Sequence, residues 1–163
     1  MSEAAGRGPA DRAAAAYDGV PAEALGERVG APAVHVFARV GSTMDVAHAL
    51  AAEGAADGTV VLADAQTGGR GRAGRTWASG GGTGVWLTVV ARPRDPEALE
   101  VLSLRVGLAL AARLDALAPA PVQVKWPNDL LVGGRKLAGI LVEARWRDGR
   151  AEWAAVGVGV NVR

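Results

Sequence analysis

The segment Gln66–Trp77 reads QTGGRGRAGRTW and contains four glycines, three arginines and no acidic residue. Two apolar runs flank it, Val60–Ala65 and Val85–Ala91, and each is predicted to be a buried strand. Glycine lets backbone N–H groups come close to a ligand, and guanidinium groups match the geometry of phosphate and carboxylate. The segment is therefore predicted to be an anion-binding loop between neighbouring strands, suited to a nucleotide.

The sequence on either side of this loop predicts an α+β fold, with helices earlier in the chain and a strand meander later. Helices are expected over Pro21–Val29, after the hydroxyl cap Ser42-Thr43, and over about six turns from Asp95 to Leu117. Further strands are expected over Val34–Val40, Val122–Trp126, Leu130–Val132, Leu137–Glu143 and Trp153–Val160. Residues 1–19 are predicted to be a disordered extension, and residues 20–163 to be one globular domain.

Composition excludes several kinds of function. The chain has 163 residues, half of them hydrophobic, and no apolar run long enough to span a membrane or serve as a signal peptide. A cytoplasmic protein without a membrane association is expected. The absence of cysteine excludes disulfides and thiolate zinc sites, and two isolated histidines give no metal cluster. A net charge of +1 disfavours a generally basic nucleic-acid-binding protein.

The two lysines fall in one short segment. Of the 18 basic residues, only Lys125 and Lys136 are lysine. A chain that otherwise uses arginine would place lysine where a compact ammonium is needed rather than a planar fork. Chance placement is the alternative, and composition alone does not decide between the two interpretations.

Three blocks of the chain, in this order, resemble the catalytic domain of the biotin protein ligases. They are Gly69–Trp77, then Lys125–Asp129 with Arg135–Glu143 after it, and finally Gly157–Asn161. The resemblance covers the chain from Val34 to its end, and Ser42-Thr43 matches the family's Ser-Thr pair, although Met44 replaces the usual asparagine. It implies a mixed, largely antiparallel sheet with helices on one face, of the class II aminoacyl-tRNA synthetase and biotin synthetase type.

The resemblance also implies an activity. Biotin protein ligases join biotin to ATP with magnesium, release pyrophosphate, and transfer biotin from biotinyl-5'-adenylate to a lysine of a biotin carboxyl carrier protein. The biotin carboxylate attacks the α-phosphate, so two anions must come together and the barrier is largely electrostatic. Cations therefore matter more than a general base.

Residue roles are implied in the same way. Lys125 and Arg72 are expected to be catalytic, and Arg70 to help fold the loop over biotin. The residues expected to bind biotin are Ser42, Thr43, Gln66, Gly69, Arg70, Arg72, Lys125, Gly157 and Gly159, and those expected to bind the nucleotide are Arg72, Arg75, Trp77 and Asn161. The roles of Asp129 and Lys136 stay open, and His35 and His48 are interpreted as structural or exposed.

The chain departs from the family pattern at its end. The family's domain normally continues beyond the Gly157–Asn161 strand, so the catalytic domain is expected to be incomplete at its C-terminal end. The last strand is then expected to leave one edge unpaired, which would favour self-association. A winged-helix DNA-binding domain is not expected before Val34, and the carrier protein and a homodimer both stay open.

Three alternatives to the ligase remain. A biotin-binding remnant of the family would bind biotin without forming the adenylate. A lipoate ligase would share the fold and the adenylation chemistry. A nucleic-acid-binding loop would use the Gly-Arg repeat, but only three arginines and one nearby tryptophan support it.

Overall fold

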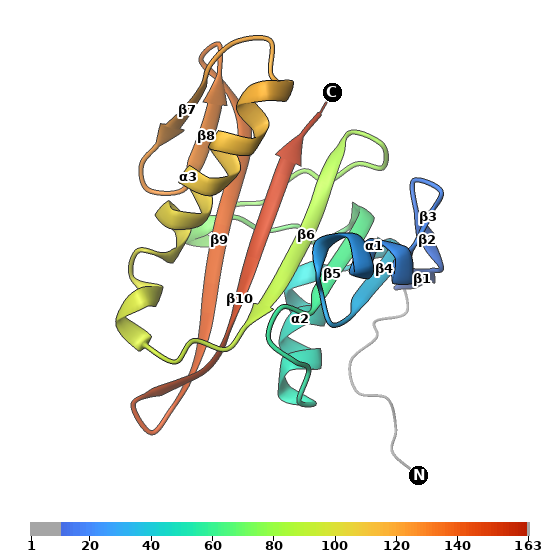
Figure 1. The fold of residues 1–163 in the computed structure, drawn as a ribbon, viewed down its shortest axis with the longest axis vertical. Coiled ribbons are helices and arrows are strands. Elements are labelled where there is room, and N and C mark those ends of the chain that lie inside the picture. The colour runs from blue at the N-terminus through green and yellow to red at the C-terminus, as the bar shows by residue number, and fades with distance from the viewer. Residues whose placement is uncertain (1–10, 163) are drawn as a thin grey trace.

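An eight-stranded sheet forms the body of the molecule (Figure 1), and its strand order is β1-β4-β5-β6-β10-β9-β8-β7. The computed structural model describes residues 11–162. Strands β4 and β5 are parallel and every other neighbouring pair is antiparallel. A mixed, largely antiparallel sheet with helices is the α+β architecture that the sequence predicts.

Most elements lie where the sequence places them. The helices are α1 (Ala22–Val29), α2 (Thr43–Ala52) and α3 (Leu102–Leu114). The strands of the large sheet are β1 (Arg12–Ala14), β4 (Val34–Val40), β5 (Val60–Gln66), β6 (Gly84–Ala91), β7 (Val122–Lys125), β8 (Asp129–Val132), β9 (Arg135–Arg147) and β10 (Arg150–Asn161). Strands β2 (Ala16–Tyr17) and β3 (Val20–Pro21) form a separate small hairpin.

The helices cover both faces of the sheet, so the expected placement on one face is wrong. In β10, Ala155 belongs to the cluster under α2, whereas Val160 packs with the cluster under α3. These residues are five positions apart, and an odd separation along a strand points their side chains to opposite faces. The central strands are apolar on both faces, and a helix on one face alone would leave the other exposed to water.

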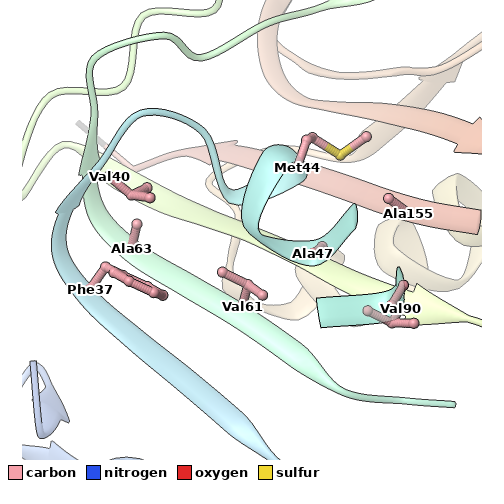
Figure 2. Packing of buried hydrophobic residues seen from close by; sticks show 9 residues of the cluster. Phe37, Val40, Met44, Ala47, Val61, Ala63, Val90 and Ala155 are labelled. Carbon is pink, nitrogen blue, oxygen red and sulfur yellow. The ribbon is translucent and has the colours of Figure 1, made fainter. Parts of the chain in front are cut away.

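Helix α2 seals the better-packed half of the core (Figure 2). Met44 and Ala47 of this helix pack on Phe37, Val61 and Val90 of three neighbouring strands, and all five residues are nearly inaccessible to solvent. Ser42 caps the helix because its Oγ accepts a hydrogen bond from the Met44 N–H at 3.3 Å. The cap and the apolar face together fix the N-terminus of α2 over the sheet.

Two other expectations about the chain differ from the structure. Residues 11–19 are not a disordered extension, because β1 pairs with β4 and the Asp11 carboxylate accepts a hydrogen bond from the Gly41 N–H at 2.8 Å. The part of that prediction that concerns residues 1–10 lies outside the described residues. The helix expected from Asp95 is interrupted, since Val101, with φ −108° and ψ 5°, separates a 3₁₀ turn at Pro96–Leu99 from α3.

The last strand is central rather than exposed. Strand β10 is hydrogen-bonded to β6 on one side and to β9 on the other. The expected unpaired edge at Trp153–Val162 is therefore wrong, because β9 and β6 already cover both sides of β10. The outermost strands of the described sheet are β1 and β7.

Candidate functional site

A cavity of about 130 Å³ lies between the N-terminus of α2, the glycine-arginine loop, and strands β9 and β10. The loop folds back on itself, because the Gly71 N–H bonds to the Arg75 carbonyl at 2.7 Å and the Trp77 N–H to the Gly69 carbonyl at 2.8 Å. The residues that line the cavity are Ser42, Thr43, Met44, Gln66, Arg70, Gly71, Arg72, Arg75, Thr76, Trp77, Leu87, Asn128, Lys136, Gly139, Ile140, Leu141, Gly157, Val158 and Gly159.

A polar network forms one wall of the cavity. The Gln66 Oε1 atom accepts hydrogen bonds from the Thr43 N–H at 2.8 Å and the Thr43 hydroxyl at 3.0 Å, while Gln66 Nε2 donates to Ser79 Oγ at 2.8 Å. Thr88, fully buried in β6, donates to Thr43 Oγ1 at 2.9 Å. These bonds join α2, β5 and β6, so the wall is preorganised.

Arg70 is committed to carboxylates of the protein. Its Nε and Nη2 atoms bind both oxygens of Glu143 in β9, at 3.0 and 2.9 Å, and its Nη1 atom lies 2.7 Å from Asp45 Oδ1 in α2. These bonds raise the pKa of Arg70 further above its ordinary value, and the Arg70 guanidinium holds the pKa of Glu143 below its ordinary value despite partial burial. Arg70 therefore anchors the loop to the sheet and to α2.

Arg72 and Arg75 have no such partners. The Arg72 Nη1 atom lies 3.5 Å from the Asn128 side-chain oxygen, and Arg75 Nε donates to the Arg72 carbonyl at 3.2 Å. Both residues are exposed at the cavity, and neither forms an ion pair within residues 11–162. They are the loop cations available to an anionic ligand.

Trp77 lies over a pair of glycines on neighbouring strands. A Cβ atom on Gly139 or Gly159 would come within 2.7 Å of the Trp77 ring, so only glycine fits beneath the indole. The ring also meets Trp86 edge-on, and the Lys136 ammonium sits 4.7 Å from its centroid. The Trp77 Nε1–H is buried and has no hydrogen-bond partner in the described part of the chain.

One row of residues runs across the sheet beneath this loop. Lys125 pairs with Asp129, Asp129 with Gly139, and Gly139 with Gly159. Val124 packs under α3 on the opposite face, so strand alternation places Lys125 on the face that carries the cavity. The Lys136 ammonium binds one member of this row, at 2.8 Å from the Asp129 carboxylate.

The structure brings together nine of the twelve expected site residues. Those nine are Ser42, Thr43, Gln66, Arg70, Arg72, Arg75, Trp77, Gly157 and Gly159. Gly69, Lys125 and Asn161 are absent from the cavity lining among the described residues. Gly69 is buried against Ser79 and Gln66, Lys125 is exposed at the end of β7, and Asn161 donates to the Lys136 carbonyl at 3.0 Å.

Several site residues were missed from the sequence. Met44, Asn128, Gly139 and Leu141 line the cavity, and Glu143 holds Arg70. Lys136, whose role the sequence left open, lines the cavity as well. Period-two alternation of β9 would have placed Gly139, Leu141 and Glu143 on one face, which is a signal that the sequence does contain. The pairing of Glu143 with Arg70 joins residues 73 positions apart, and no local pattern indicates it.

Carboxylates near the cavity are already paired with cations. Asp45 and Glu143 bind Arg70, and Asp129 binds Lys136. Residues 11–162 contain no group of three or more histidine, cysteine, aspartate or glutamate side chains arranged to hold a metal ion. No helix in the same range is long and apolar enough to cross a membrane.

A largely antiparallel sheet that carries a cationic loop above a glycine-floored cavity defines an α+β domain built to bind an anionic ligand. The chain belongs to the biotin/lipoate A/B protein ligase family, whose model matches residues 36–161. This match confirms the family that the three sequence blocks indicate.

The curated relatives are ligases. The chain is 44% identical over 133 residues to the biotin–[acetyl-CoA-carboxylase] ligase of Mycobacterium tuberculosis, which covers 78% of this chain and 48% of that protein. It is 40% identical over 122 residues to the bifunctional ligase/repressor BirA of Bacillus subtilis, which covers 74% of this chain and 38% of that protein. The chain therefore spans half or less of the length of these relatives.

Solved structures agree with the fold. The biotin protein ligase of Aquifex aeolicus in complex with biotin and ATP superimposes with a TM-score of 0.67 at 33% identity, over 80% of this chain and 52% of that one. The biotin protein ligase of Leishmania major in complex with biotinyl-5-AMP also gives a TM-score of 0.67, at 35% identity, over 80% of this chain and 57% of that one. The class II synthetase-like fold class is confirmed.

Proposed function

We propose that this chain is the biotin-activating part of a biotin–protein ligase. It would join biotin to ATP, form biotinyl-5'-adenylate, and pass biotin to a lysine of a biotin carboxyl carrier protein. The observation that carries this proposal is that the three loop arginines have different partners. Arg70 is bound to Glu143 and Asp45, whereas Arg72 and Arg75 face the cavity without a carboxylate partner.

Relatives support the substrates. The Mycobacterium tuberculosis relative is a biotin–[acetyl-CoA-carboxylase] ligase, and the similar structures hold biotin with ATP or biotinyl-5-AMP. This chain matches only about half the length of these proteins. The ligase activity and the carrier-protein partner are therefore proposed for this chain and not taken over from the relatives.

The chemistry needs positive charge where two anions meet. The carboxylate oxygen of biotin forms a bond to the α-phosphorus of ATP, the bond from that phosphorus to the bridging oxygen breaks, and pyrophosphate leaves with the electron pair. Arg72, Arg75 and Lys136 line the space in which this charge would develop, and removal of one preorganised donor of this kind costs ~10²–10³ in rate. Lys125 is proposed to reach the same space from the end of the cross-sheet row.

The ligand requires a change at Trp77. A cavity of about 130 Å³ is smaller than the roughly 300–1,000 Å³ of common ligand pockets, and the Trp77 indole occupies the glycine floor. Binding would therefore move the indole off Gly139 and Gly159 and release its buried Nε1–H to a ligand acceptor. The loop would then close over the adenylate, a mixed anhydride that water destroys.

The described residues contain no cluster of free carboxylates that could bind magnesium. The carboxylates at the cavity are paired with Arg70 and Lys136, and three or more metal-ligating side chains do not gather anywhere in residues 11–162. The residues present do not fit a dedicated magnesium site. We propose magnesium-ATP as the substrate complex, since nucleotide phosphates supply ligands to this ion.

Two of the other functions are weakened by the site. A nucleic-acid-binding loop would lose Arg70, which two carboxylates already hold. A biotin-binding remnant would need a cation for the single biotin carboxylate, whereas Arg72 and Arg75 both face the cavity without a carboxylate partner. A lipoate ligase belongs to the same family and shares the adenylation chemistry, so specificity needs a measurement.

Calorimetry separates biotin from lipoate. We expect heat of binding with biotin and at least tenfold weaker binding of lipoate, because the polar wall of Ser42, Thr43 and Gln66 suits a ureido head and a dithiolane ring offers no matching hydrogen bonds. Equal affinities would contradict biotin specificity, and tighter lipoate binding would favour the lipoate ligase.

A further inference from the structure

A chain of hydrogen bonds runs from β10 through α2 to Glu143, the residue that anchors the loop through Arg70. Its first two members, Trp153 and His48, are not among the site residues predicted from the sequence. Trp153 Nε1 lies 3.0 Å from His48 Nδ1, and His48 Nε2 lies 3.2 Å from Glu143 Oε2. Glu143 in turn holds Arg70 with both oxygens. His48 and Trp153 lie outside the cavity lining.

The tautomer of His48 follows from its neighbours. An indole Nε1 carries a hydrogen and can only donate, so His48 Nδ1 must accept and carries no proton. The remaining proton of a neutral imidazole is then on Nε2 and points at the Glu143 carboxylate. The contact with Trp153 therefore favours the tautomer in which Nε2 carries the hydrogen and donates to Glu143.

The position of Glu143 determines what Arg70 does. Glu143 Oε2 accepts from both His48 and Arg70, while Oε1 accepts from Arg70 alone. The two side chains of the Arg70–Glu143 pair are about one-third exposed, whereas Asp45, the other carboxylate on Arg70, is 68% exposed. Glu143, which His48 contacts, is thus the less solvent-exposed of the two carboxylates on Arg70. His48 therefore acts on the Arg70–Glu143 ion pair, which anchors the loop to β9.

Arg70 belongs to the loop itself. It pairs with Thr76 across the loop, directly beside the Gly71–Arg75 and Gly69–Trp77 hydrogen bonds. Arg72 and Arg75 lie between these points, and their side chains have no carboxylate anchor of their own within residues 11–162. The orientation of the two unpaired arginines therefore depends on the Arg70 anchor.

We propose that His48, with Trp153 behind it, is a positioning residue that orients Glu143 on Arg70 and thereby holds the loop carrying Arg72 and Arg75 over the cavity. The effect on biotin rests on the proposed function, but the effect on the loop does not. His48 lies outside the cavity lining and acts only through Glu143.

Three variants and one control test the proposal in the ligand-free chain. His48→Leu removes both hydrogen bonds. His48→Gln keeps a donor for Glu143 and an acceptor for Trp153, and Trp153→Phe removes only the donor that sets the tautomer. Glu53→Gln, on the exposed C-terminal cap of the same helix, is the matched control. Urea unfolding of each variant confirms that it is folded before its loop is measured.

The measurement is hydrogen exchange at the Gly71 and Trp77 amides, with the rate of tryptic cleavage after Arg72 and Arg75 as a second readout. We expect His48→Leu to speed both by roughly tenfold, the scale of one lost hydrogen bond to a charged group. His48→Gln should stay within about twofold of the original chain on the same scale, Trp153→Phe should fall between them, and Glu53→Gln should not differ.

Two results would overturn the proposal. One is a folded His48→Leu chain whose loop is as protected as the original. The other is a His48→Gln chain as unprotected as His48→Leu, which would mean that packing rather than hydrogen bonding at His48 matters. If the loop responds as expected but calorimetry shows no biotin binding to the original chain, the proposed function fails while the positioning role stands.

Discussion

At the scale of single residues, the two lysines have different surroundings although they lie only eleven positions apart in the chain. Lys136 lines the cavity, binds Asp129 and sits against Trp77. Lys125 is exposed at the end of the row that leads to Gly139 and Gly159, and its side chain forms no hydrogen bond or ion pair within residues 11–162. The surroundings of the two lysines therefore predict different kinetic effects.

Alanine variants separate the two roles. Lys136→Ala should weaken biotin binding and slow adenylate formation together, because it removes a cavity wall and the cation on Trp77. Lys125→Ala should slow adenylate formation by up to ~10²–10³ with a smaller loss of binding, since a cation matched to developing charge acts mainly in the transition state. Pyrophosphate release and calorimetry give the two quantities. An unchanged rate in Lys125→Ala would transfer the catalytic role to Lys136.

The sequence located the arginine loop, and the structure places Arg72 and Arg75 of this loop at the cavity. Anion binding by Gly69–Trp77 stays a prediction that rests on the type of side chain. The commitment of Arg70 to Glu143 could not be predicted, because it depends on how β9 registers against α2 and the loop. Lys136 was left open for the same reason, since its place over Trp77 is set by tertiary packing.

At the scale of elements, the Arg70–Glu143 ion pair joins the loop to β9, and its strength depends on pH because Glu143 can take up a proton. Hydrogen bonds from Arg70 lower the pKa of Glu143 below its ordinary value of 4.5. A carboxyl with a depressed pKa stabilises the folded state above its unfolded pKa, and this contribution is lost as the pH falls through the folded pKa. The stabilisation by the Arg70–Glu143 ion pair should be complete at neutral pH and decrease only below about pH 4.5, where the carboxyl of the unfolded chain begins to take up a proton.

Glu143→Gln tests this pH dependence. Urea unfolding of the two chains should differ most at neutral pH and converge as the pH falls below about 4.5, because the original chain then loses the charged pair and the variant never has it. Glu53→Gln controls for the general change of charge on an exposed surface. Parallel stability curves for Glu143→Gln and the original chain over this range would show that the pair contributes nothing.

Elements were predicted well where apolar periodicity was strong. Val34–Val40 was predicted with the bounds that the structure has, and α2 begins at the predicted hydroxyl cap. The helix expected from Asp95 to Leu117 shares its apolar spacing with α3, but the break at Val101 is a backbone feature that this spacing does not reveal. Strand β1 is only three residues long and alanine-rich, so it forms because β4 offers an edge and not because of its own pattern.

At the scale of the whole molecule, both edges of the described sheet are short strands. Strand β1 covers the outer edge of β4, and β7 is the outer strand at the other end. The self-association expected from an exposed β10 loses its basis, because β10 is paired on both sides. The sequence could not show that β10 is a central strand, because the position of a strand in a sheet depends on which other strands pair with it and not on its own residue pattern.

Truncation tests the role of the first strand. Removal of residues 2–19 takes away β1, β2 and the Asp11 contact to Gly41, so we expect a loss of about 1–3 kcal/mol in the free energy of unfolding relative to a chain that lacks only residues 2–10. This difference corresponds to a few hydrogen bonds. Urea denaturation of the two truncated chains measures it, and equal unfolding midpoints would restore the interpretation of residues 11–19 as a dispensable extension.

Biotin activation by this chain is tested by mass spectrometry of the folded chain after incubation with biotin and magnesium-ATP, followed by addition of a biotin carboxyl carrier domain. We expect biotinyl-5'-adenylate in the first step, a biotin mass gain on the carrier lysine in the second, and neither product in a chain carrying Arg72→Ala and Arg75→Ala. A folded chain that binds biotin but forms no adenylate would show that the chain does not activate biotin and would favour a binding remnant.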